Sequence, residues 1–207
     1  TGVQTCALPI SKLFRNNSST MLVLAGIIVS GFMSALQGLA KYIADPDSQL
    51  ASIVFWTMGS LASVKAKTIL AVLPAMLVAF TLVIGIRWRI NLLSLGDAEA
   101  QSLGVNIPVV RGLAVLCSTI LTACSVCISG TIGWVGLVIP HFSRLIIGED
   151  NRFMLPASIL FGAMFMIVVD TLARCLSSSE IPLSIITGIL GTPVFIILLR
   201  KQRAKID

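Results

Sequence analysis

Residues 112–143 read GLAVLCSTILTACSVCISGTIGWVGLVIPHFS, a run of 32 residues without Asp, Glu, Lys or Arg. As one α-helix this run would be about 48 Å long, whereas the hydrocarbon core of a bilayer is about 30 Å thick. Its second half contains the helix-breaking residues Gly130, Gly133, Gly136 and Pro140. We therefore predict a full span over about 109–129 and a short or broken one over about 131–146, because irregular backbone at membrane depth is tolerated inside protein or beside a wet cavity.

The rest of the chain repeats this apolar pattern. Further uncharged stretches occupy residues 21–40, 68–86, 153–169 and 181–199. Hydrophobic residues make up 56% of the chain and charged residues only 12%, against about 25% charged in soluble domains. The sequence predicts an all-α, polytopic transmembrane helix bundle of about six membrane segments. The remaining four spans are expected over Met21–Ala40, Thr68–Ile86, Phe153–Cys175 and Pro182–Leu199.

Ser48–Val64 is also uncharged, which leaves a seventh span open as an alternative. Only Lys65–Lys67 would separate it from the next span, which is short for a turn between two crossing helices. A further crossing would also move the downstream basic clusters to the opposite side of the membrane. We therefore expect a short helix at the membrane interface, with Trp56 as its amphipathic anchor.

Basic residues divide unevenly between the two sides of this topology. With six crossings, both ends of the chain share one side. That side carries Lys12, Arg15, Arg87, Arg89, Arg111, Arg144, Arg152, Arg200, Lys201, Arg203 and Lys205, and the other carries Lys41, Lys65, Lys67 and Arg174. Because cytoplasmic loops are enriched in Lys and Arg, both ends are predicted to be cytoplasmic. The net charge of +6 is thus a topology signal and does not indicate nucleic-acid binding.

The sequence offers few groups for catalysis or metal binding. The phosphate-binding pattern G-x-x-x-x-G-K-[ST] is absent, so we expect no ATP binding by that route. His141 is the single histidine, and a polar residue at a helix end explains it better than a proton relay. Cys124 and Cys127 form a C-x-x-C pair without a second pair or a nearby acid, so we predict no metal site and no cofactor.

Two polar segments remain as candidates for function. Asp170 and Arg174 are spaced i,i+4, which fits either a local ion pair near the headgroups or an outward docking point. Residues 95–105, LGDAEAQSLGV, favour a short amphipathic helix that Gly104 ends. This segment is either an ordinary solvated loop or a helix presented to a soluble partner. No acid is expected at the membrane midplane, which weakens the alternative of an ion-coupled secondary transporter.

Six stretches carry a resemblance to a known family. They are LAGIIVSGF (24–32), FWTMGSL (55–61), NLLSLGDAEAQSLGV (91–105), GTIGWVGLVIPHFSRLIIGEDNRFMLP (130–156), VVDTLARCL (168–176) and IPLSIITGILGTPVFIILL (181–199). From about Ser19 to Arg200 the chain resembles the FecCD-type permeases of ABC importers for iron-siderophores, haem and vitamin B12. That family has ten spans per subunit, and this chain resembles the last six. Residues 1–12 depart from the pattern, so we expect a non-native or fragment-end tail there and a transmembrane permease domain over 13–207.

The resemblance implies an assembly in the cytoplasmic membrane of a bacterium or archaeon. Such a permease pairs with a second permease subunit, as a homodimer or with a homologue. It works with two cytoplasmic ABC ATPases, which hydrolyse the ATP, and with an extracytoplasmic substrate-binding protein. The permease itself is then not an enzyme. Without the resemblance, an ion-coupled secondary transporter and a membrane-embedded enzyme or assembly factor remain the alternatives.

The resemblance also implies roles for particular residues. Asp97, Glu99 and Gly104 match the loop that couples the permease to its ATPase, and Arg174 matches an arginine that docks the binding protein. Ser19 and Thr20 match the approximate position of a cytoplasmic gate. The helix over Ser48–Val64 matches an outer helix that touches the binding protein. The choice among siderophore, haem and cobalamin stays open.

Overall fold

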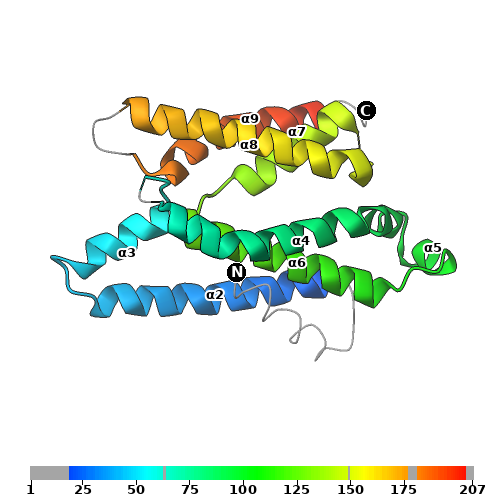
Figure 1. The fold of residues 1–207 in the computed structure, drawn as a ribbon, viewed down its shortest axis with the longest axis horizontal. Coiled ribbons are helices and arrows are strands. Elements are labelled where there is room, and N and C mark those ends of the chain that lie inside the picture. Colours follow the sequence, from blue (N-terminus) through cyan, green and yellow to red (C-terminus); the bar gives the residue numbers. More distant parts are fainter. Residues whose placement is uncertain (1–18, 63, 149, 177–180, 204–207) are drawn as a thin grey trace.

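The computed structural model describes residues 19–62, 64–148, 150–176 and 181–203 (Figure 1). Every regular element in these ranges is a helix. The helices are α2 (Ser19–Ile43), α3 (Gln49–Met58), α4 (Ala66–Leu93), α5 (Asp97–Ser102), α6 (Ile107–Ser129), α7 (Val135–Ile147), α8 (Asn151–Leu176) and α9 (Leu183–Arg203). The predicted all-α class is confirmed. The predicted tail over residues 1–12 lies outside the described residues.

Several of these helices are long and apolar enough to cross a membrane. Within the described ranges they are α2 from Val23 onward, α4, α6 and α8. Shorter apolar helices are α3, α7 and residues 183–196 of α9. The predicted break in the long uncharged run is confirmed, because α6 ends at Ser129 and α7, of 13 residues, begins at Val135.

Two predicted boundaries differ from the structure. The helix α4 continues past the expected end at Ile86 to Leu93, so Arg87 and Arg89 belong to the helix. Long arginine side chains can reach the headgroups from a helix end, and arginine is a good helix former, so these charges do not stop the helix. The helix α3 is shorter than the predicted Ser48–Val64, because Gly59 ends it with φ 71°.

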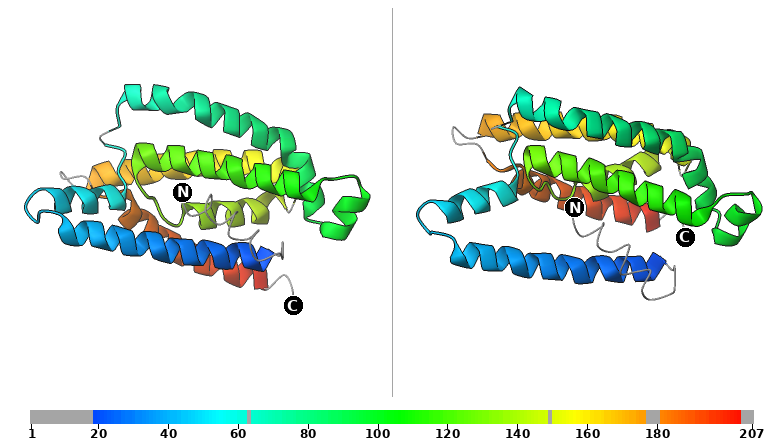
Figure 2. Two further views of the ribbon diagram at one scale, coloured as in Figure 1. Left: turned by 90° about the horizontal axis from the view of Figure 1, so that it is seen from below. Right: turned by 60° about the horizontal axis from the view of Figure 1, so that its bottom comes forward.

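The helices form two groups that run along one axis (Figure 1). The helix α4 packs against α6 and α8, and α7 packs against α8 and α9. In the right-hand view of Figure 2, α2 lies apart from the other long helices. Its residues 31–40 are exposed, so the small-residue face at Ser30, Ser34 and Gly38 meets no described helix.

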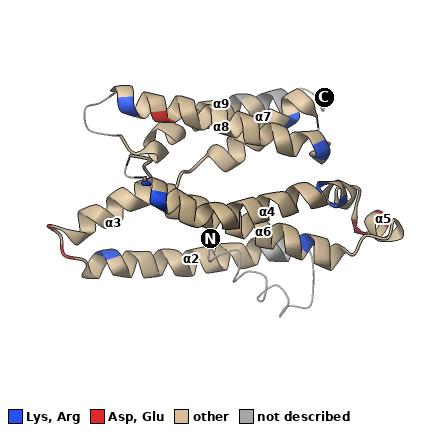
Figure 3. Cartoon of the chain, in the orientation of Figure 1, with Lys and Arg blue, Asp and Glu red and all other residues tan. Residues whose placement is uncertain are grey.

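The two ends of this bundle differ in the elements that they hold. The α5 end contains α5, the last turn of α4 and the first turns of α6 and α8, and the α3 end contains α3, the last turns of α6 and α8 and the first turn of α9. Figure 3 shows Lys and Arg mostly near these ends. Charged side chains are thereby kept from the apolar middle of the bundle.

Three chain segments cross closely at the α3 end. Ser60 donates its N–H to the carbonyl oxygen of Ser129 at 2.9 Å, and Leu183 donates to that of Gly59 at 2.9 Å. The hydroxyl of Thr131 donates to the carbonyl oxygen of Thr57. These contacts fasten the end of α3 to the end of α6 and to the start of α9. They also satisfy backbone groups where the chain leaves regular helix.

The break between α6 and α7 is shaped by a tryptophan in an uncommon conformation. Trp134 has φ 68°, the one positive φ among the described residues that are not glycine. A Cβ on Gly191 of α9 would lie 2.9 Å from Cβ of Trp134, and one on Gly188 would lie 3.7 Å from its Nε1. A side chain at Gly191 would therefore collide with Trp134, whereas the contact at Gly188 is an ordinary one, and glycine at 191 lets the start of α7 pack closely against α9.

We expect Gly130→Ala to lower the free energy of unfolding by about 2 kcal/mol or more. Gly130 has φ 71°, and a Cβ there would overlap the carbonyl oxygen of Trp56 and lie 3.0 Å from Cα of Gly59. Equilibrium unfolding in mixed detergent micelles measures the change. The matched control is Gly133→Ala, because nothing lies within 4 Å of a Cβ at that position. Equal stability of both variants would contradict the crossing described above.

Candidate functional site

The α5 segment is a single short helix held between two glycines. Gly96 has φ 120° before it and Gly104 has φ 77° after it, conformations that favour glycine. The N–H of Leu103 donates to the carbonyl of Glu99 at 3.2 Å, and that of Val105 to the carbonyl of Ala100 at 3.1 Å. The predicted amphipathic helix ended by Gly104 is confirmed.

One face of α5 is anchored in an apolar cluster. Ala100 is completely buried, together with Val105 and Val110. The partly buried side chains packed around them are Ile90, Leu92, Leu93 and Ile107. Since most of these residues belong to the last turn of α4 and the first turn of α6, α5 is packed against both helices.

The polar side chains of α5 are exposed around this buried anchor. They are those of Asp97, Glu99 and Gln101. Oδ1 of Asp97 accepts a hydrogen bond from Nη2 of Arg111 at 2.9 Å, so one acid of the segment is paired within the chain. The Asp97 side chain is still 60% exposed, so the pair contributes about 1 kcal/mol or less to the free energy of unfolding. A rigid helix with an acidic outer face can dock against a soluble protein.

At the α3 end, Asp170 and Arg174 form the predicted ion pair. Nε of Arg174 donates to Oδ2 of Asp170 at 2.9 Å, and the arginine side chain is half exposed. Both side chains border an open depression whose other walls are formed by Ser60, Leu61, Ala62, Ala173, Ile181 and Leu183. The local ion pair that the spacing predicted is confirmed. The exposed half of the Arg174 side chain faces this surface.

The predicted gate residues stand at the start of α2. The helix begins at Ser19 and continues through Thr20, but the side chains of both lie outside the described part of the chain. Their role as a gate stays a prediction. Elsewhere, the ring of His141 packs edge-on against Phe195 with centroids 5.6 Å apart. Among the described residues, no group of three or more His, Cys, Asp or Glu is placed to share a metal ion.

Sequence reasoning missed a contact between the end of α4 and the start of α8. Asn91 and Asn151 meet there through hydrogen bonds, and Arg152 lies over the ring of Trp88. Sixty positions separate the two asparagines. No local periodicity connects residues so far apart, so the sequence contains no signal that pairs them.

Residues 4–201 match the FecCD transport family. The chain belongs to this family. It is 45% identical over 190 residues to the molybdate import system permease protein MolB of Haemophilus influenzae, covering 92% of this chain and 56% of MolB. It is 38% identical over 204 residues to the hemin transport system permease protein HmuU of Yersinia pestis, covering 97% of this chain and 60% of HmuU.

A solved structure gives the same fold for this FecCD family chain. It is described as an inward-facing conformation of a metal-chelate type ABC transporter, with a TM-score of 0.88 and 45% sequence identity. The match covers 94% of this chain and 63% of that chain. The present chain thus spans somewhat more than half of the length of the relatives that it matches.

We expect α5 to depend on Ala100 much more than on the Asp97–Arg111 pair. Asp97→Ala removes an exposed ion pair worth about 1 kcal/mol or less, so amide exchange over residues 97–105 stays close to that of the parent. Ala100→Asp places a carboxylate in a fully buried site and costs more than about 2 kcal/mol, so these amides lose protection. Hydrogen exchange with mass spectrometry compares the protection of these amides in the two variants and the parent. Greater loss in Asp97→Ala than in Ala100→Asp would show that the ion pair holds the helix.

Proposed function

We propose that this chain forms part of the transmembrane permease of an ATP-driven importer for a metal-containing nutrient. Membership of the FecCD transport family carries this proposal. Relatives named for iron chelatin, hemin, vitamin B12 and molybdate transport support the substrate class. The cargo is accordingly an iron chelate, haem, cobalamin or molybdate, and the permease forms the translocation path.

The energy for import comes from other subunits in this proposal. The sequence has no Gly-Lys pair and thus no phosphate-binding loop of the P-loop type. Two cytoplasmic ABC ATPases hydrolyse ATP, a second permease subunit completes the path, and an extracytoplasmic binding protein delivers the cargo. The permease is then a transport subunit and not an enzyme.

The α5 end faces the cytoplasm in the membrane of a bacterium or archaeon. The segments at this end contain Arg87, Arg89, Arg111 and Arg152, and the end of α9 adds Arg200, Lys201 and Arg203. The α3 end contains Lys41, Lys65, Lys67 and Arg174. The larger number of basic residues supports a cytoplasmic α5 end and a cytoplasmic C-terminus.

The α5 segment couples the permease to the ATPase. Asp97 and Glu99 lie on its exposed face, and Gly104 permits the turn that returns the chain to α6. Because Ala100 fixes α5 to the last turn of α4, a displacement of α5 moves α4 and α6 as a body. Ligand-driven closure of partner subunits commonly acts through such rigid-body shifts. Ser19 and Thr20, at the same end, are proposed to form part of the cytoplasmic gate.

Arg174 and α3 form the surface that receives the binding protein. The guanidinium is half exposed beside the depression at the α3 end, and α3 is fastened nearby through Gly59 and Leu183. Phe55 and Trp56 on α3 are exposed and fit a membrane interface. A positive charge on this rim attracts an acidic group on the binding protein and orients its approach.

Replacing α5, residues 97–102, with a Gly-Ser linker of the same length is expected to uncouple hydrolysis from uptake. The linker cannot form the Ala100 anchor, so displacement at the ATPase no longer moves α4 and α6. Uptake into proteoliposomes and ATP hydrolysis are measured on the assembled importer. The control is the same replacement of residues 44–48, in the turn between α2 and α3 at the opposite end. A wild-type ratio of uptake to hydrolysis in the α5 variant would contradict the coupling role.

Arg174→Glu is expected to weaken docking of the binding protein by about tenfold or more, which corresponds to about 1.4 kcal/mol. The reversed charge repels an acidic partner group at this exposed rim. Surface plasmon resonance with the permease in nanodiscs measures Kd. Lys67→Glu is the matched control, because it reverses a charge at the same end without lining the depression. An unchanged Kd for Arg174→Glu, or an equal loss for both variants, would rule out a specific docking role.

A further inference from the structure

An asparagine of α4 accepts hydrogen bonds from the first turn of α8. The backbone N–H of Asn151 donates to Oδ1 of Asn91 at 3.1 Å, and Nδ2 of Asn151 donates to the same oxygen at 3.4 Å. The first N–H groups of a helix have no partner within that helix. Asn91 therefore caps α8 from α4, and both side chains are half-buried at this contact.

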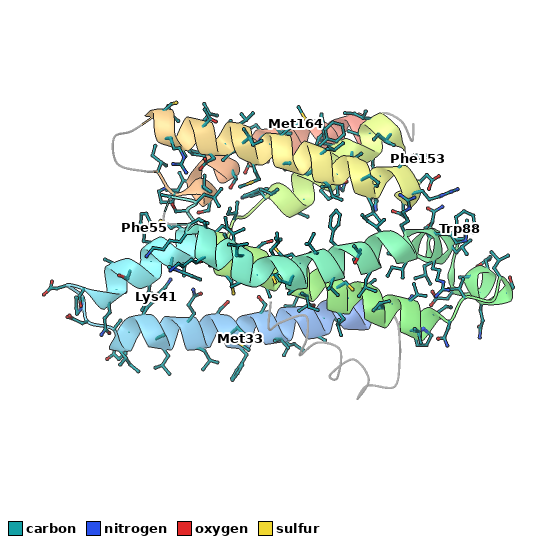
Figure 4. The ribbon with its side chains drawn as sticks, viewed as in Figure 1. Met33, Lys41, Phe55, Trp88, Phe153 and Met164 are labelled. Atoms are coloured by element: carbon teal, nitrogen blue, oxygen red, sulfur yellow. The ribbon has the colours of Figure 1, made fainter. Side chains whose placement is uncertain are left out.

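A backbone carbonyl of α8 that lacks its helical donor also contacts α4. Pro156 has no N–H, so the carbonyl of Arg152, four residues earlier, lacks its helical donor. Nη1 of Arg87 lies 3.5 Å from that carbonyl oxygen. The guanidinium of Arg152 lies in turn 4.8 Å from the ring centroid of Trp88. In Figure 4, Trp88 and Phe153 mark this place at the α5 end.

These contacts, made by Arg87, Trp88 and Asn91 of α4 with Asn151 and Arg152 of α8, define the α4–α8 junction. The end of α4 also holds the α5 segment, because Ile90, Leu92 and Leu93 pack against the buried Ala100 cluster. The last two turns of α4 thus contact α5 through apolar side chains and α8 mainly through polar ones. A displacement of α5 is therefore also a displacement of the group that caps α8.

The far end of α8 contains the docking residue. This helix is continuous from Asn151 to Leu176 and holds the Asp170–Arg174 pair in its last turns. Val169 and Ala173 of these turns are buried with Leu183 and Ile186 of α9. One helix thus joins the α4–α8 junction at one end of the bundle to the exposed arginine at the other.

We propose that Asn91 is a positioning residue through which binding-protein docking at Arg174 stimulates the ATPase that contacts α5. The inference rests on the proposed function. Docking at Arg174 shifts α8 along or about its axis, and the cap at Asn151 transmits the shift to the last turn of α4 and to α5. The coupling is reciprocal, so ATP binding at α5 also alters the affinity of the outer surface.

The test uses the assembled importer in nanodiscs, with ATP hydrolysis measured with and without saturating binding protein. We expect Asn91→Ala to lower the ratio of stimulated to unstimulated hydrolysis by about fivefold or more. Asn91→Asp keeps this ratio, because a carboxylate oxygen still accepts both hydrogen bonds from Asn151. The Kd of the binding protein is measured alongside, so that loss of docking is not mistaken for loss of stimulation.

The matched control is Asn106→Ala. Asn106 also caps a helix at this end, but its side chain accepts from Val109 of its own helix α6, at 3.4 Å. We expect this variant to retain the stimulation ratio. A wild-type ratio in Asn91→Ala, or an equal loss in Asn91→Ala and Asn106→Ala, would overturn the proposal, the latter because it reports general destabilisation.

The α5 linker variant separates this inference from the proposed function. If that variant couples hydrolysis to uptake normally, the proposed coupling role of α5 is contradicted, and so is the role of Asn91 that depends on it. If it uncouples while Asn91→Ala retains full stimulation, the role of α5 stands and only the connection through α8 is wrong.

Discussion

The constraint that governs this chain is that backbone polar groups in a bilayer must be satisfied by the protein itself. Long helices satisfy most of them, and the remaining groups lie where helices begin, end or break. The structure pairs these groups across elements: Ser60 with Ser129 and Leu183 with Gly59 at the α3 end, and Asn151 with Asn91 at the α5 end. The tertiary arrangement is therefore fastened by hydrogen bonds at its two polar ends.

This arrangement gives the two ends different capabilities. At the α5 end, a short helix with an acidic face is fixed to α4 and α6 through Ala100. At the α3 end, Arg174 stands half exposed beside a depression, with α3 fastened next to it. The helix α8 reaches both ends. Under the proposed function, it joins the surface for the binding protein to the surface for the ATPase.

The sequence predicted the features that depend on local composition. Uncharged runs predicted the long helices, and the glycines after residue 129 predicted the break between α6 and α7. The i,i+4 spacing predicted the Asp170–Arg174 pair. Features that depend on contact between distant segments were missed. The helix α3 ends early at Gly59 because the chain crosses Gly130 there. Asp97 pairs with Arg111, 14 positions later, and Asn91 meets Asn151, 60 positions later. Such contacts between distant segments leave no periodic pattern within either segment.

The orientation of the two ends is the central claim, and site-specific thiol labelling in intact cells tests it most directly. Single cysteines are introduced by Glu99→Cys in α5 and Asp47→Cys before α3. The background lacks all five native cysteines, because Cys127 and Cys175 are themselves exposed. A membrane-impermeant maleimide is predicted to label the Asp47→Cys protein in intact cells and the Glu99→Cys protein only after permeabilisation. Labelling of the Glu99→Cys protein from outside intact cells would place α5 away from any cytoplasmic ATPase and contradict the account.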